Sequence, residues 1–136
     1  MTEEMKTKLV KILKNNTKWP LIIEGVSSAN FPTSIVLSAN TPSSDLGVIS
    51  DETGLKLPSF AQEILIKSKK SKKIILCING LDEISQEEQE KFYGIIKYKG
   101  INGFKFPEGT QIIITAKNAN KISKRIVKLA LSFKVE

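Results

Sequence analysis

The chain has 136 residues, of which 40% are hydrophobic and 26% charged, a composition typical of one globular domain. It contains one cysteine and no histidine, which excludes an internal disulfide, a typical zinc site and histidine-based catalysis. The formal net charge is +7, and Arg125 is the single arginine among 21 basic residues. No apolar run approaches the ~20 residues of a membrane span. We therefore expect no membrane partner and a reduced, cytoplasmic setting.

The N-terminal part predicts a helix followed by a buried strand. Apolar side chains recur at helical spacing within residues 3–15, with lysines on the opposite face, and Asn15 and Asn16 are expected to end the helix. Trp19 is expected to be a packing anchor before a short strand at 21–24, which ends at Gly25.

The next segments alternate between polar loops and short apolar elements. Residues 27–34 are small and polar, and a second strand is expected at 35–37. Residues 40–54 predict irregular structure. A helix opens at Pro58 and Ser59 and ends in the lysine run 67–73, where cations suit the helix dipole.

The second half predicts a repeating strand and helix pattern. Residues 74–78 are all apolar, as in a central parallel strand, and Cys77 is expected to be a buried hydrophobe there. Ser85 and Glu88 form a capping box that opens a helix to about Lys99, and a turn-rich excursion follows at 100–109.

The C-terminal part continues this alternation. A buried strand is expected at 111–115, then a lysine-rich helix reaching about Ala130, then a last strand at 132–135. All-apolar strands that alternate with helices indicate an α/β fold with a mainly parallel sheet.

Acidic and amide side chains follow two of these strands. Asp82 and Glu83 come after strand 74–78, and Asn118 follows strand 111–115. Ligands bind at the carboxyl edge of parallel sheets, where an Asp can hold Mg²⁺ and a neighbouring Glu or Asn can orient an attacking water. Each residue also has a structural interpretation, because acids suit a helix start and Asn118 can cap the following helix.

Residues 72–118, KKIILCINGLDEISQEEQEKFYGIIKYKGINGFKFPEGTQIIITAKN, resemble the core of the AAA+ ATPases, particularly the MoxR and McrB-like branch. The fragment IVLSANTPSSDLG is similar to that group's second strand and the segment after it. The resemblance implies that Asp82 is the Walker B aspartate and metal ligand, Glu83 the catalytic glutamate and Asn118 the sensor-1 residue. The NGLDE sequence is also similar to the DGLDE of NACHT-type NTPases, and in that register Asn79 replaces the metal-binding Asp. The register with Asp82 as the Walker B aspartate is preferred here, because the downstream excursion at 100–109 fits it better.

The same resemblance implies parts that the sequence lacks. A phosphate loop, GxxxxGK[ST], should follow the first strand, since its backbone N–H groups and its lysine hold the phosphates. Here GVSSANFPTS keeps only Gly25 as a remnant of the cofactor-binding position. Lys128 begins the segment where an arginine finger is expected, and the sequence stops before a C-terminal lid. We therefore expect no bound cofactor and little hydrolysis.

The link between the first two strands leaves their relative direction open. Only eight residues, 27–34, separate Val26 from Ile35, whereas a parallel crossover usually takes a dozen or more residues and a helix. Eight extended residues reach roughly 28 Å. The resemblance requires a displacement of three strands, roughly 14 Å. Strand 35–37 is therefore parallel through an extended link, or it is antiparallel or placed elsewhere.

Together these features predict a three-layer α/β fold, P-loop NTPase-like and AAA+-like, with a mainly parallel sheet, helices on both faces and no phosphate-loop helix. Residues 1–18 would be an N-terminal amphipathic helix and 19–136 the core of one domain. The expected function is non-catalytic, a protein-interaction or regulatory module that binds a related ATPase or itself. One alternative is a minimal ATPase that binds ATP and Mg²⁺ and completes its site across a subunit interface. Another is a lysine-rich nucleic-acid-binding module.

Overall fold

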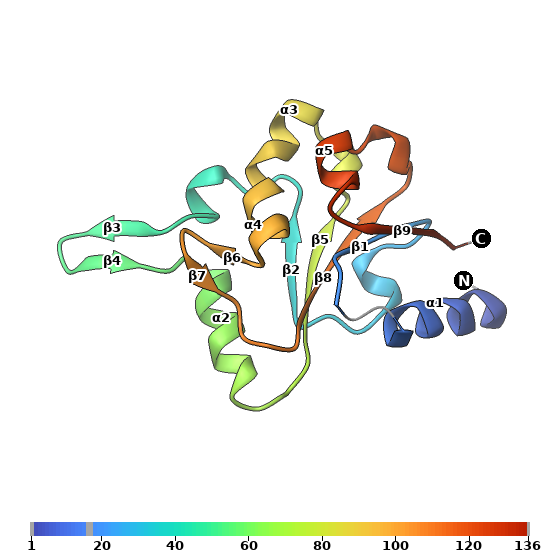
Figure 1. The fold of residues 1–136 in the computed structure, drawn as a ribbon, viewed down its shortest axis with the longest axis horizontal. Helices are drawn as coiled ribbons and strands as arrows, with labels where there is room; N and C mark the ends of the chain where they lie inside the picture. The colour runs from blue at the N-terminus through green and yellow to red at the C-terminus, as the bar shows by residue number, and fades with distance from the viewer. Residues whose placement is uncertain (1, 16–17, 136) are drawn as a thin grey trace.

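The computed structural model describes residues 2–15 and 18–135 and is built around one five-stranded, all-parallel sheet (Figure 1). Its strands are β1 (Leu21–Glu24), β2 (Ile35–Ser38), β5 (Ile74–Asn79), β8 (Thr110–Ala116) and β9 (Leu131–Lys134). Their order across the sheet is β2-β5-β8-β1-β9. The predicted parallel α/β fold and each of its five main strands are confirmed.

Helices and short 3-10 turns connect the strands. The helices are α1 (Glu3–Asn15), α2 (Ser59–Ser68), α3 (Gln86–Gln89), α4 (Tyr93–Tyr98) and α5 (Lys124–Val127). The 3-10 turns are η1 (Ser28–Asn30), η2 (Ser43–Asp45), η3 (Leu81–Glu83), η4 (Glu90–Phe92) and η5 (Ala119–Lys121). The helix predicted at 3–15 is confirmed, while Asn16, expected to end it, lies outside the described residues.

The sheet separates two hydrophobic clusters, because successive side chains of a strand point to opposite faces. On one face, Ile22, Leu76 and Ile112 pack with buried side chains of α2, α4 and α5. On the other face, Cys77 and Ile113 pack with buried side chains of α1 and with the loop after β1. Helices therefore cover both faces, and the sheet forms the middle layer.

Strand β2 lies parallel to β5, which resolves the direction left open by the short link. The chain leaves β1, makes only the turn η1 and reaches the far edge of the sheet without a crossover helix. Ser34, just before β2, is held against β5 by two hydrogen bonds. Its N–H donates to the Ile75 carbonyl (2.9 Å), and its hydroxyl accepts from the Ile75 N–H (3.0 Å). The extended link was the correct one of the alternatives.

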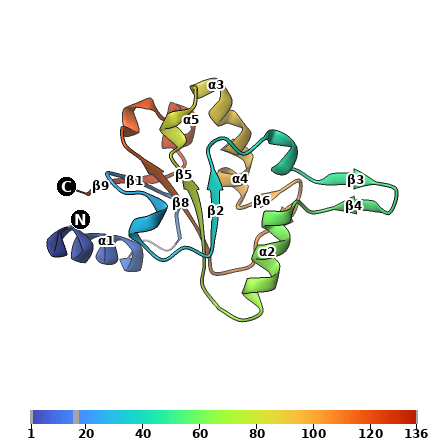
Figure 2. The ribbon, with the colours of Figure 1, turned by 180° about the vertical axis from the view of Figure 1, so that it is seen from behind.

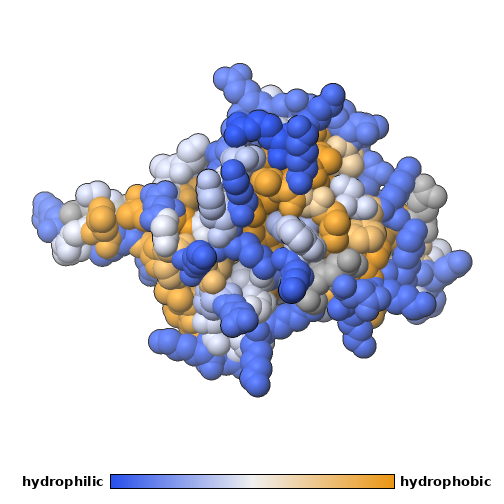
Figure 3. All heavy atoms as spheres, viewed as in Figure 1, coloured by the Kyte–Doolittle hydropathy of each residue, from blue (hydrophilic) through white to orange (hydrophobic). Residues whose placement is uncertain are grey.

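Two antiparallel hairpins lie outside the main sheet. One consists of β3 (Ile49–Asp51) and β4 (Gly54–Lys56), and the other of β6 (Gly100–Ile101) and β7 (Phe104–Lys105). The β3–β4 hairpin projects from the body in both ribbon views (Figures 1 and 2), and Leu55 on it is 77% exposed. Figure 3 shows hydrophobic surface on this projection and beside it. The prediction of irregular structure over 40–54 was wrong for the hairpin.

Three other expectations need correction. The helix predicted from Ser85 to about Lys99 is divided into α3, η4 and α4, although Phe92, Ile95 and Ile96 are buried as expected. The helix predicted after Asn118 shortens to η5 and α5. Trp19 is 61% exposed and is not a packing anchor, because the buried residue at this corner is Pro20.

The described residues include no helix that is long and apolar enough to cross a bilayer.

Candidate functional site

The candidate site lies at the carboxyl edge of the sheet, where β1, β5 and β8 end side by side. The final residues of these strands are Glu24, Asn79 and Ala116. The loops that follow carry the predicted residues Gly25, Asp82 and Asn118. The topology therefore brings the predicted positions to one edge, as the sequence pattern requires.

Asp82 holds the loop that follows β8. The chain turns at the end of β5 through Gly80, which has a left-handed φ of 72°, and enters η3, which contains Asp82. The Asp82 Oδ2 atom accepts hydrogen bonds from the N–H groups of Lys117 (3.1 Å) and Asn118 (2.8 Å). Its other oxygen, Oδ1, is buried and has no hydrogen-bond partner among the described residues.

Glu83 and the Asn118 side chain do not converge on Asp82. Glu83 is exposed, and its N–H closes η3 by donating to the Gly80 carbonyl (2.9 Å). The Asn118 side chain caps η5, since its Oδ1 accepts from the Asn120 N–H (3.0 Å). The structural interpretation of Asn118 is therefore confirmed, while its contact with Asp82 runs through the backbone N–H.

A second carboxylate, missed by the sequence analysis, performs a similar task. Glu24 at the end of β1 accepts from the Ala119 N–H through Oε1 (2.7 Å), and its Oε2 lies 3.7 Å from the Lys134 ammonium. Three consecutive N–H groups, 117 to 119, thus bind two carboxylates, one in η3 after β5 and one at the end of β1. The sequence signal that could have identified Glu24 is its position as the one charged residue at the end of the apolar strand LIIE.

Asn79 is the centre of a second hydrogen-bond network. Its Oδ1 accepts from the Thr115 hydroxyl (2.8 Å) and from the Ser28 N–H (2.9 Å). The Thr115 hydroxyl oxygen in turn accepts from the Gly80 N–H (3.0 Å). These bonds join the loop after β1 to the ends of β5 and β8.

The Gly25 turn is closed by neighbouring backbone. Gly25 has a φ of 94°, and its N–H donates to the Ala116 carbonyl (2.9 Å). A Cβ at this position would lie 2.4 Å from the Val135 carbonyl oxygen. Only glycine fits here, and the reason is the close passage of the chain after β9.

Four consecutive N–H groups after Gly25 are occupied within the chain. Those of Ser27 and Ala29 donate to the Asn30 Oδ1 (2.9 Å) and the Ser27 Oγ (3.3 Å). Those of Ser28 and Asn30 donate to the Asn79 Oδ1 (2.9 Å) and the Ser27 carbonyl (3.0 Å). A phosphate cradle requires such groups to point at the ligand. Three of the groups in this loop donate to oxygens of the loop itself, and the Ser28 N–H donates to Asn79 at the end of β5.

Metal and thiol chemistry receive little support from this edge. Within residues 2–15 and 18–135, no three acidic, cysteine or histidine side chains gather so that they could hold a metal ion. Burial in the central strand raises the pKa of the Cys77 thiol to about 12, so this thiol stays protonated at neutral pH.

Arg125, the only arginine, is occupied at the surface of α5. Its guanidinium pairs with the Glu90 carboxylate (2.8 Å) and lies 4.1 Å from the centre of the Tyr93 ring. The hydrogen bond from Arg125 is the main reason that the pKa of Tyr93 is lowered. These contacts tie α5 to η4 and α4.

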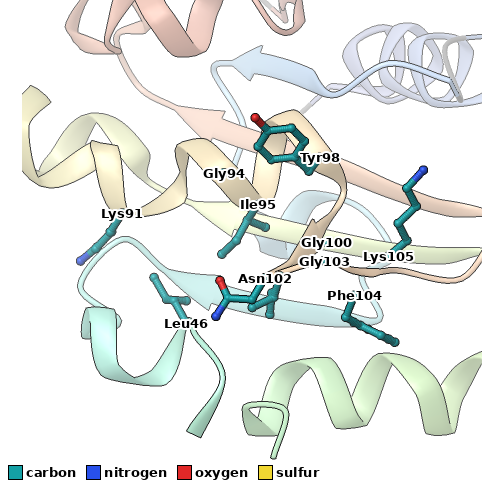
Figure 4. Close-up of a pocket in the computed structure, with 11 residues that line it drawn as sticks. Leu46, Lys91, Gly94, Ile95, Tyr98, Gly100, Asn102, Gly103, Phe104 and Lys105 are labelled. Carbon is teal, nitrogen blue, oxygen red and sulfur yellow. The ribbon is translucent and has the colours of Figure 1, made fainter. Parts of the chain in front are cut away.

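Two surface hollows lie away from this edge. The larger, about 500 Å³, lies between α4 and the β6–β7 hairpin, with Leu46 and Ile95 among its apolar lining and Lys91 and Lys105 at opposite ends (Figure 4). The second, about 430 Å³, lies where β1 and β9 begin. The sequence analysis anticipated neither hollow, because each is lined by segments far apart in the chain.

No protein-family model matches the sequence, and a search of curated proteins found no significant match.

Proposed function

We propose that this chain is an AAA+-like domain that does not use nucleotide and acts as a protein-interaction or regulatory module. The strand order supports this assignment, since β2 lies three positions from β1 and β5 is next to β8, as the resemblance requires. The observation that carries the proposal is the occupied loop after Gly25. Four successive N–H groups that would have to bind phosphate already bind oxygens of the chain.

The hydrogen bonds also favour one of the two family registers. Asn79 ends its strand and contacts the segment that stands where a phosphate loop would be, through the Ser28 N–H. Asp82 instead binds the loop after β8. The NGLDE register, with Asn79 at the metal-ligand position, therefore suits these contacts better. An amide there lacks the negative charge that Mg²⁺ prefers in a ligand.

An uncovered part of the sheet offers a surface for a partner. β2 is an edge strand, and Val36 on it is 46% exposed. The short link between β1 and β2 provides no helix to cover this side chain. Exposed edge strands pair readily with other chains. We expect the partner to be a second copy of this chain or a related, active ATPase.

Two measurements test the proposal. Calorimetric titration with ATP and Mg²⁺ should give no binding heat. Sedimentation velocity over a range of concentrations, alone and with an active ATPase of the resembled group, should reveal association that Val36→Lys weakens. Val10→Lys is the matched control, since Val10 is 53% exposed on α1 and the charge change is identical. A complex that assembles only with ATP would contradict the proposal, as would a chain that remains monomeric and unbound throughout.

One observation favours the minimal ATPase as a second candidate. The Asp82 Oδ1 atom is buried without a partner among the described residues, which suits an oxygen that awaits a cation or its water shell. This candidate requires sub-millimolar binding of ATP with Mg²⁺ that Asp82→Asn weakens.

A further inference from the structure

The hollow of about 430 Å³ lies at the opposite end of the sheet from the candidate site. Three segments form it: residues 18–20 before β1, residues 96–99 at the end of α4, and residues 128–131 before β9. The Leu131 N–H donates to the Pro20 carbonyl (2.9 Å), which fixes two of these segments together. The volume of this hollow, called the groove below, falls within the range of about 300–1,000 Å³ that is usual for ligand sites.

All the charge in the lining of this groove is positive. Lys18, Lys97, Lys99 and Lys128 line it, and no acidic residue is among its described lining residues. Lys99 is partly buried, and burial lowers the pKa of its ammonium group. An incoming anion would stabilise this charge, which has been partly removed from water.

An exposed tryptophan is the second feature of this groove. Trp19 is 61% exposed although tryptophan is usually well buried, and it lines the same groove. Leu129, Ala130 and Leu131 add apolar surface. The groove therefore offers a flat aromatic face, an apolar wall and several positive point charges within one site.

We propose that this groove binds single-stranded nucleic acid, with a base stacked on Trp19 and the phosphates contacted by the four lysines. Aromatic faces and cationic side chains along a groove are the two elements by which single strands are bound without sequence preference. Lysine contacts phosphate as a point charge, and no arginine is present in the groove to read a base edge through two hydrogen bonds. Binding should therefore tolerate any sequence.

Other occupants fit the same features less well. An acidic peptide would match the charges but leave the Trp19 face without a planar partner. A second copy of this chain, docked groove against groove, would bring four more lysines to the contact. The proposal is independent of the proposed interaction function, because it uses the other end of the sheet.

Fluorescence anisotropy of a short, labelled oligothymidylate or oligouridylate tests the proposal with the full chain. Affinity should fall as salt rises, with a log–log slope of about −0.7 for each phosphate contacted, or about −3 for four lysines. Trp19→Ala should weaken binding by about tenfold, while Trp19→Phe should retain most of it. Lys99→Gln with Lys128→Gln should weaken binding and reduce the steepness of the slope by about 1.4.

The matched control is Lys69→Gln with Lys70→Gln. These exposed lysines at the end of α2 lie outside the groove, and their loss changes the net charge equally. Circular dichroism verifies that each variant is folded. Absence of binding at low salt would overturn the proposal, and so would an equal effect of the control pair. Equally tight binding of polyglutamate would also overturn it, by indicating a site that recognises charge alone.

Discussion

Single carboxylates at the carboxyl edge of the sheet act as caps for main-chain N–H groups. Asp82 and Glu24 together satisfy three consecutive donors in the loop after β8. Hydrogen bonds to an ionised acceptor are worth roughly 1.5–3 kcal/mol each, more than neutral ones. Asp82, which a motif search would assign to catalysis, therefore contributes with Glu24 to holding the strand ends in place.

This role predicts that Asp82→Ala destabilises the fold. The N–H groups of Lys117 and Asn118 would lose their acceptor, at a cost of about 1–3 kcal/mol in the free energy of unfolding measured by urea titration. Glu83→Ala is the control, since Glu83 is exposed and its change should stay within about 0.5 kcal/mol. Equal stability of the two variants would argue against capping by Asp82.

Gly25 provides a second prediction at this scale. Gly25→Ala would place a Cβ against the Val135 carbonyl and also strain a backbone with φ of 94°, so it should cost more than the ~1 kcal/mol of strain alone. Gly54→Ala separates the two effects, because its φ is 116° and a Cβ there meets no atom within 4 Å. Thermal unfolding should rank Gly25→Ala as clearly the less stable variant.

The Cys77 thiol predicts a loss of stability in alkali. Burial raises its pKa from 9.0 to about 12 in the folded chain, so above pH 9 the unfolded state releases this proton first and is favoured. Between pH 9 and pH 10 the stability advantage over Cys77→Ala should shrink by about 1 kcal/mol. Paired urea titrations at the two pH values measure this difference, and a constant advantage would show that the thiol ionises equally in both states.

At the scale of elements, Gln89 connects α3 to the segment around η5. Its side-chain amide donates to the carbonyls of Ile84 (3.2 Å) and Lys121 (2.9 Å) and accepts from the Ser123 N–H (2.7 Å). Gln89 is fully buried, so these bonds form out of contact with water. The Gln89 side chain therefore fixes α3 against η5 and the residue that precedes α5.

Gln89→Leu should consequently loosen this connection. The side chain keeps a similar size, but the Ser123 N–H and the Lys121 carbonyl lose a buried partner, each at about 1–3 kcal/mol. Gln86→Leu, at an exposed position of the same helix, serves as the control and should have little effect. Faster hydrogen exchange at Ser123 in the Gln89 variant alone would give the local evidence.

The sequence predicted the elements that have a strong internal pattern. Strand β5 was recognised from an unbroken apolar run, and α1 from the spacing of its apolar residues. Local pattern did not reveal the break at η4, since Phe92 is buried in either conformation. The hairpin β3–β4 was missed because a small projecting element needs little apolar sequence, and Leu55 points largely to solvent.

The candidate site was predictable in position but not in its bonding. Strand ends placed Asp82 and Asn118 at one edge, as expected from parallel topology. The roles of Glu24 and Thr115 depend on contacts between strands that are distant in sequence, which no local pattern encodes. The exposure of Trp19 likewise depends on how three separate segments meet.

For the whole molecule, the parallel direction of the strands separates two regions that can be tested independently. The carboxyl ends of the strands carry the occupied loop after Gly25, and their amino ends carry the lysine and tryptophan groove. α1 and the residue after β9, Val135, belong to one hydrophobic cluster, so the first and last described elements stabilise each other. Variants at one edge should leave binding at the other unchanged.

The pairing of β1 also has a consequence for how the chain is made. Its neighbours are β8 and β9, so Leu21 finds its partners, Ile113 and Leu131, only near the end of the sequence. Such distant pairings slow folding, because the chain loses the entropy of closing a long loop before the stabilising contacts between the strands can form. A nascent chain still attached to the ribosome would hold LIIE without a neighbour until the residues of β8 have been synthesised. Chains arrested before Thr110 should remain sensitive to protease, and release of the full chain should give protection in one cooperative step.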